Sequence, residues 1–137
     1  MDRKNISYGG GTNKIEFCDL FHKNKTIVHG KRYGGSSLLS HLFAQAVVSG
    51  NLFLADAGFR KDVNQRLPAS HRFRDIDKRP TPGEYEIAFA IISEFDGALR
   101  FPFFSRVTLR NAARQLRNFG YSVTCTKVPV IDPDRNR

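Results

Sequence analysis

Three side chains near the N-terminus have the types and spacing needed for work on a phosphodiester. Asp19 is followed ten residues later by the segment His29-Gly30-Lys31. A carboxylate can hold Mg²⁺, and a lysine ammonium can assist the attacking water or stabilise the charge of the transition state. We expect Asp19, His29 and Lys31 to form a catalytic centre. The same residues also suit a structural or solvated role.

A β-hairpin is the element that must bring these groups together. Residues 15–21 and 26–31 have strand patterns and are joined by a polar turn, and His29 and Lys31 share one face of the second strand. The first strand carries the two candidate ligands of a Mg²⁺ cofactor, Asp19 and Glu16. They lie on opposite faces of a regular strand, so only one of them would join the site.

A core helix is predicted over 38–49, with Ser36 or Ser37 as its N-cap and Gly50 as its end. Its N-terminus would offer free backbone amides to a phosphate, which makes Arg32, Ser36 and Ser37 candidate nucleic-acid contacts.

The same helix carries polar residues at a regular spacing. Ser37, His41 and Gln45 recur at i, i+4 and i+8 among apolar neighbours. Buried polar groups need partners, so we expect His41 and Gln45 to line the catalytic centre. An internal hydrogen-bond network is the alternative.

Positive charge is concentrated in the last third of the chain. The 137 residues include 22 Lys and Arg against 13 Asp and Glu, a net charge of +9, and six basic residues but no acid lie between 97 and 131. A helix predicted over 109–119, capped by Thr108 and closed by Gly120, places Arg110, Arg114 and Arg117 on one face. With no acid to pair with, these arginines and Arg106 are free to meet phosphates. A solvated surface is the other interpretation.

The remaining segments complete a single domain over residues 1–137. Helix is predicted over 56–67, a long loop over 68–83, and strands over 85–93 and 121–128. The order indicates an α/β or α+β fold with a mixed sheet, an N-terminal hairpin and helices packed on the sheet. Residues 1–13 and 129–137 are expected to be irregular and flexible.

The uncharged run over 33–55 raises the question of a membrane span. Serine, His41 and Gln45 interrupt it, so a buried helix is predicted and no membrane partner is expected. The N-terminus shows no signal-peptide pattern. The two cysteines, Cys18 and Cys125, form no metal-ligand spacing, which favours a reduced cytoplasmic protein. A homodimer and a protein partner both stay open.

Two known nuclease families share features with these motifs. Asp19 and the segment 29–31, followed by a helix, resemble the PD-(D/E)xK nuclease core, which implies a restriction-endonuclease-like fold and metal-dependent hydrolysis. In this chain His29 stands where that family usually has glutamate. His29 and Lys31 with Gly35-Ser36 also resemble the phospholipase D-type nucleases, whose histidine is a nucleophile, although the following Asp and Asn of that motif are missing.

A longer resemblance covers most of the chain. The segments Ile15–Leu20, His29–Arg32, Ser36–Phe43, Pro102–Ser105 and Leu109–Ala113 are similar to the C-terminal part of a sporadically distributed family of uncharacterised bacterial proteins. This resemblance implies a bacterial, phage or other mobile-element setting and a short member or fragment of something longer. It implies no established activity.

These observations support two hypotheses of different class. The first is a nucleic-acid-acting, nuclease-like hydrolase whose arginines hold the backbone of DNA or RNA. The second is a binding module without catalysis, which would bind DNA or RNA or dock on a nucleoprotein complex, as in phage defence or counter-defence. The histidine at position 29 favours the second.

Overall fold

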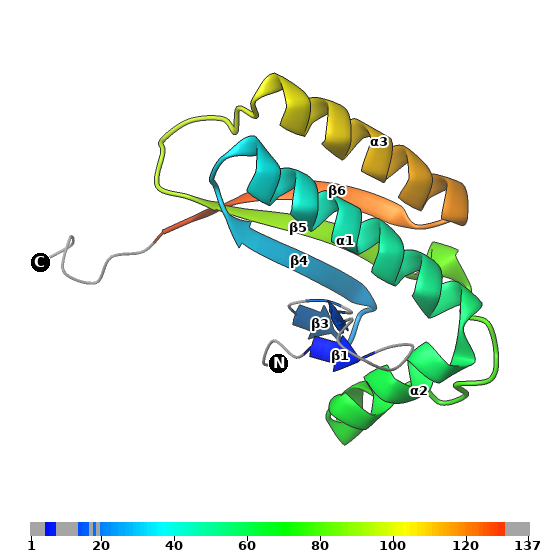
Figure 1. Ribbon diagram of the computed structural model, residues 1–137. Helices are drawn as coiled ribbons and strands as arrows, with labels where there is room; N and C mark the ends of the chain where they lie inside the picture. Colours follow the sequence, from blue (N-terminus) through cyan, green and yellow to red (C-terminus); the bar gives the residue numbers. More distant parts are fainter. Residues whose placement is uncertain (1–4, 8–13, 17, 19, 131–137) are drawn as a thin grey trace, which may run out of the picture.

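A four-stranded mixed sheet forms the centre of the molecule (Figure 1). The computed structural model describes residues 5–7, 14–16, 18 and 20–130. The strand order is β3 (Leu20–His22), β4 (Thr26–Arg32), β5 (Glu86–Ser93) and β6 (Ser122–Pro129). β3 pairs antiparallel with β4, whereas β4, β5 and β6 run parallel. A separate hairpin pairs β1 (Asn5–Ser7) with β2 (Lys14–Glu16). The prediction of one strand over 15–21 is therefore wrong: its beginning pairs with β1, and only its end, in β3, pairs with β4.

Two crossovers connect the parallel strands. α1 (Ser36–Ala55) and α2 (Ala57–Arg66) lie between β4 and β5 in the chain, and α3 (Phe103–Phe119) lies between β5 and β6. α1 and α3 lie side by side on one face of the sheet (Figure 1), where the hydroxyl oxygens of Ser40 and Thr108 are 3.1 Å apart. The result is a single small α+β domain, as the sequence predicts. A restriction-endonuclease-like core stays a prediction.

The sheet buries one set of alternate side chains beneath the helices. In β5, Ile87, Phe89 and Ile91 are fully buried, while the residues between them are half-exposed. The parallel register places His29 beside Phe89 and Lys31 beside Ile91. The predicted shared face of His29 and Lys31 is therefore confirmed as the face that looks towards α1 and α3.

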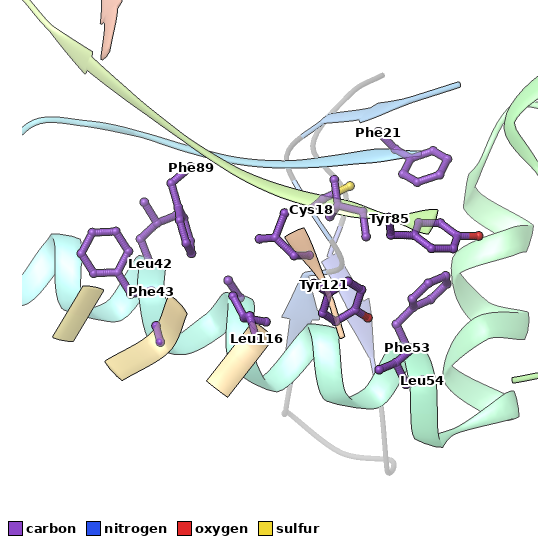
Figure 2. Close-up of a cluster of buried hydrophobic side chains, with 14 of the residues drawn as sticks. Cys18, Phe21, Leu42, Phe43, Phe53, Leu54, Tyr85, Phe89, Leu116 and Tyr121 are labelled. Atoms are coloured by element: carbon purple, nitrogen blue, oxygen red, sulfur yellow. The ribbon is translucent and has the colours of Figure 1, made fainter. Parts of the chain in front are cut away.

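Aromatic contacts attach α1 to this face. Phe43 meets Phe89 edge-on with ring centroids 5.1 Å apart, and Phe53 meets Tyr85 in the same way at 5.1 Å (Figure 2). Replacing such a fully buried phenylalanine with alanine costs about 3–5 kcal/mol. Two contacts ten residues apart on one helix fix both its position and its direction across the sheet.

The apolar run over 33–55 forms the central helix of this core. Within the described part of the chain, α1 is the helix that is long and apolar enough to cross a membrane by length and composition. Its Leu39, Phe43 and Phe53 are fully buried in the domain. The prediction of a helix buried in the domain is confirmed for the side that packs on the sheet.

Gly50 does not end this helix, as the sequence predicted, because α1 continues to Ala55. A Cβ atom at Gly50 would lie 3.0 Å from Leu116 Cδ2 and 3.3 Å from the ring of Tyr121. The Tyr121 hydroxyl donates a hydrogen bond of 2.7 Å to the Gly50 carbonyl. The glycine therefore permits close packing of α1 against α3 and β6. Its role is not that of a helix terminator.

Three other predicted boundaries are also wrong. Gly35, rather than Ser36 or Ser37, is the N-cap of α1. α3 begins at Phe103 instead of Leu109, and Thr108 lies inside it with its hydroxyl donating to the Ser105 carbonyl. The third is the segment 5–7, which forms β1 by pairing with β2 where irregular chain was expected. By contrast, the predicted α2 and the closure of α3 by Gly120 are confirmed.

Gly120 generates a prediction about backbone strain. It has φ of +111°, and a Cβ atom there would lie 2.6 Å from Pro82 Cγ, whereas Gly97 has φ of +89° with open space around it. A left-handed backbone costs a residue with a side chain about 1–2 kcal/mol. We expect Gly120→Ala to lower the free energy of unfolding more than Gly97→Ala does, because only the alanine at position 120 would clash with Pro82. Urea titrations of both variants measure this difference. An equal decrease in the free energy of unfolding for both variants would mean that Pro82 moves aside without an energetic penalty.

Tyr121 generates a prediction about alkaline pH. Burial raises the pKa of Tyr121 above its ordinary value of about 10. The folded state therefore keeps this proton at a pH where the unfolded chain has lost it, so this stabilisation is complete below pH 10 and is lost as pH rises further.

Tyr121→Phe should therefore lower stability near neutral pH by about 1–3 kcal/mol, because the Gly50 carbonyl loses its donor. The difference from the parent should narrow above pH 10 by up to about 1.4 kcal/mol per pH unit. Urea titrations of both proteins from pH 7 to 11 measure this difference, and lysine ionisation cancels between them. A constant difference would contradict the prediction.

Candidate functional site

The hairpin centre is described only in part. Asp19 lies outside the described residues, and for Glu16 only the backbone in β2 is described. His29 is 4% exposed and lies beneath α1, with its ring centroid 6.1 Å from that of Phe89. The placement of His29 is that of a core residue, and its catalytic role stays a prediction.

Lys31 is the member of the predicted centre that reaches an open edge. It is half-buried near the end of β4, where the parallel strands present their carboxyl ends. Among the described residues, Lys31 has no ion pair or hydrogen bond from its ammonium group. In α/β sheets this edge is where ligands commonly bind.

Other residues at the same edge are already engaged. The ammonium group of Lys127 donates to the carbonyls of Phe95 and Gly97, which ties β6 to the loop before α3. Arg32 is exposed and lies 3.7 Å from the carboxylate of Glu94. A surface pair of this kind contributes little to stability, so Arg32 can still exchange its partner for a phosphate.

The polar stripe on α1 lies on the side of the helix that points away from the sheet. Ser37 and His41 are exposed and Gln45 is half-buried. At 100° per residue, His41 and Gln45 point about 160° away from Phe43, which contacts the sheet. The prediction that this stripe is buried is wrong, whereas its lining of the centre stays a prediction, because Asp19 and the side chain of Glu16 lie outside the described residues. Leu, Phe and Ala fill the inner side of this helix, and its polar residues meet solvent.

The Mg²⁺ prediction gains no support from the described residues. They bring no group of three or more His, Cys, Asp or Glu side chains together. The two candidate ligands are the carboxylates of Asp19 and Glu16, which lie outside the described side chains. We therefore derive no step that passes through a metal ion.

The predicted arginine face of α3 is present and extends further than expected. We use "arginine face" for Arg106, Arg110, Arg114 and Arg117, all of which are exposed. Their directions around the helix axis fall within about 80° of one another at 100° per residue. The opposite side of the helix buries Ala112, Ala113 and Leu116. In the part of the chain that the structure describes, no carboxylate lies at ion-pair distance from these four guanidinium groups.

Two exposed aromatic rings at the start of α3 were missed by the sequence analysis. Phe103 is 65% exposed and Phe104 is 70% exposed. The guanidinium carbon of Arg106 lies 5.9 Å from the centroid of Phe103, which continues the arginine face by one turn. Pro102, directly before the helix, was the available signal for this earlier start, because proline is favoured where helices begin.

A second basic region, also missed, lies at the opposite edge of the sheet. A cavity of about 590 Å³ opens between the β3–β4 turn, α2 and the long segment before β5. At its margin the ammonium group of Lys25 is 2.7 Å from the Glu84 carboxylate. This hydrogen bond raises the pKa of Lys25 and lowers that of Glu84, while burial raises the pKa of Tyr85. The only signal in the sequence was the density of Arg and Lys between 60 and 79.

The fold and these surfaces define a small α+β protein with two basic regions and a lysine at the carboxyl edge of its sheet. The family described as "Family of unknown function (DUF6119)" matches residues 1–129, and the chain belongs to this family. No curated protein and no solved structure matches the chain. The predicted membership of a family of uncharacterised proteins is confirmed.

Proposed function

We propose that this protein binds nucleic acid and grips the sugar-phosphate backbone with the arginine face of α3. The observation that carries the proposal is the set of four exposed guanidinium groups on one helix face, with no carboxylate at ion-pair distance among the described residues. Free arginines in this number are costly in self-repulsion and suit a polyanion.

The length of the arginine face fits several phosphates. Eleven residues separate Arg106 from Arg117, which is about 17 Å along the helix axis. One strand of B-form DNA presents a phosphate about every 3.4 Å along its axis, so about five phosphates pass along this face. Guanidinium groups bind phosphate oxygens in a planar, bidentate manner.

Phe103 favours a single-stranded ligand over a duplex. An exposed ring beside a row of arginines offers a base a stacking surface, and base stacking on an aromatic side chain contributes about 1–3 kcal/mol. A duplex keeps its bases stacked internally and gains nothing from this ring. A nucleic-acid ligand supports a cytoplasmic location. The motif resemblance supports a bacterial, phage or mobile-element setting.

The arginine face is tested with the double variant Arg110→Gln, Arg114→Gln. We expect affinity for a 15-nucleotide single strand of DNA or RNA to fall at least tenfold at low salt. The slope of log affinity against log salt should become shallower by roughly 1.4, because two phosphate contacts are lost. Fluorescence anisotropy at several salt concentrations measures both quantities.

The matched control is Lys61→Gln, Arg66→Gln, which removes the same charge from the exposed surface of α2. It should change affinity much less. Absence of binding by the parent even at low salt, or equal losses in both double variants, would refute the arginine face as the binding surface. Phe103→Ala should weaken single-strand binding and leave duplex binding nearly unchanged.

Phosphodiester hydrolysis is the second candidate function, and Lys31 is the observation that favours it. Its ammonium group has no ion pair among the described residues and lies at the edge where α/β sheets commonly bind ligands. If the protein cleaves, Lys31→Ala should lower the rate roughly 100-fold or more while binding is retained.

The measurement is cleavage of labelled single-stranded and duplex DNA and RNA with Mg²⁺ or Mn²⁺. The parent is compared with Lys31→Ala and with Arg110→Gln, Arg114→Gln. No cleavage of any substrate by the parent, or equal cleavage by the parent and Lys31→Ala, would exclude catalysis through this lysine. It would leave the binding module as the function.

A further inference from the structure

The cavity at the amino ends of β4 and β5 has the size of a small-molecule site. Its volume of about 590 Å³ lies within the range of about 300–1,000 Å³ that is usual for such sites. The β3–β4 turn, α2 and the segment before β5 enclose it. It lies at the opposite edge of the sheet from Lys31. Its lining includes seven basic side chains and only two acidic ones.

One of the basic side chains, Arg60, is built into the wall of the cavity. It is 4% exposed, and it donates hydrogen bonds to the carbonyls of Phe53, Leu54 and Ile76 at 2.8, 3.1 and 2.8 Å. These three bonds use Nε and Nη1, and among the described residues the two N–H groups of Nη2 have no acceptor and can donate to a ligand.

No carboxylate forms an ion pair with this guanidinium among the residues that the structure describes. A buried charge that is compensated only by carbonyl dipoles is costly, and an anion in the cavity would neutralise it. The same bonds hold the chain near Ile76 against α1 and α2. Arg60 therefore supplies a buried positive charge to the cavity and also holds the wall of the cavity in place.

The margin of the cavity carries cations that form no ion pair with a described acid. The two acids of the lining each have one partner among the described residues: Glu84 accepts from Lys25, which is also in the lining, and Asp75 accepts from the backbone N–H of Asp77. Four exposed basic side chains of the lining have no ion pair or hydrogen bond in the described part of the chain. These are Lys23, Arg74, Lys78 and Arg79.

Aromatic rings form the inner side of the same cavity. The ring centroids of Phe21 and Phe73 are 5.6 Å apart, and those of Phe73 and Tyr85 are 6.5 Å apart. The ammonium group of Lys25 lies 5.4 Å from the centroid of Tyr85. A wall of rings beneath a margin of cations complements a ligand that joins a flat aromatic group to phosphate.

We propose that this cavity binds a nucleoside phosphate, with the phosphate near Arg60, Arg74 and Arg79 and the base against the aromatic wall. The ligand chemistry has two sources, which are a free nucleotide and the 5′-phosphorylated end of a nucleic acid. The proposal does not depend on the arginine face, which lies on a different element.

The test uses two double variants of the full chain with equal charge. Arg74→Gln, Arg79→Gln removes cations from the cavity, and neither side chain has a hydrogen bond that holds the fold among the described residues. Arg110→Gln, Arg114→Gln removes the same charge from α3. Arg60 is left unchanged because it supports the wall. Circular dichroism and thermal unfolding confirm that both variants fold like the parent.

Titration calorimetry with ATP, AMP and adenosine gives the expected ranking. The parent should bind one ATP per chain and bind adenosine much more weakly. The cavity variant should lose roughly tenfold or more in ATP affinity, since two charge-assisted contacts to the phosphates are removed. The α3 variant should retain ATP binding.

The source is resolved with 5′-phosphorylated and 5′-hydroxyl trinucleotides on the α3 variant, whose strand contacts are reduced. Preference for the phosphorylated trinucleotide over ATP assigns the cavity to strand ends, and the reverse assigns it to free nucleotides. Failure of the folded parent to bind ATP, AMP or a 5′-phosphorylated trinucleotide would overturn the proposal. Equal losses in the two double variants would also overturn it. Neither result bears on strand binding by the arginine face, which is tested separately by the salt dependence of single-strand affinity.

Discussion

The handedness of the two parallel crossovers is the constraint on which the rest of the structure depends. β4, β5 and β6 lie side by side in chain order and run parallel. Because both crossover connections have the same handedness and both step towards β6, α1 and α3 lie on the same face of the sheet (Figure 1). Each helix therefore has a neighbour as well as a sheet to pack on. The inner side of α3 is buried through Ala112, Ala113 and Leu116, so the arginines lie on its outer side.

The sequence pattern predicted an element correctly where residues adjacent in the chain determine its structure. The period-two face of β4, the strand at β5, the helix at α2 and the closure of α3 at Gly120 were all predicted from adjacent residues. Gly50 was misjudged because its role comes from Leu116 and Tyr121, which lie about seventy positions away in the chain (Figure 2). A glycine that permits close packing looks the same in sequence as one that ends a helix.

The same distinction applies to the candidate functional residues: those whose arrangement depends on one helix alone were predicted, and those that depend on distant elements were not. The arginine face repeats on one helix and needed no partner element to be recognised. His41 and Gln45 repeat just as regularly, but their direction depends on which side of α1 meets the sheet, and aromatic contacts of Phe43 and Phe53 decide that. The cavity draws its lining from three separate segments, with Arg60 supplying the bonds that connect them. No single stretch of sequence carries that pattern.

The contact between Gly120 and Pro82 joins the two basic regions mechanically. Pro82 begins the short turn that leads to Glu84 and Tyr85 in the cavity lining, and its ring lies against the backbone at the end of α3. The segment before β5 is thus packed directly against the end of the helix whose last turn carries Arg117. The lining of the cavity and the last turn of the arginine face therefore belong to one continuous packed unit, in which a proline ring lies against a residue with no side chain.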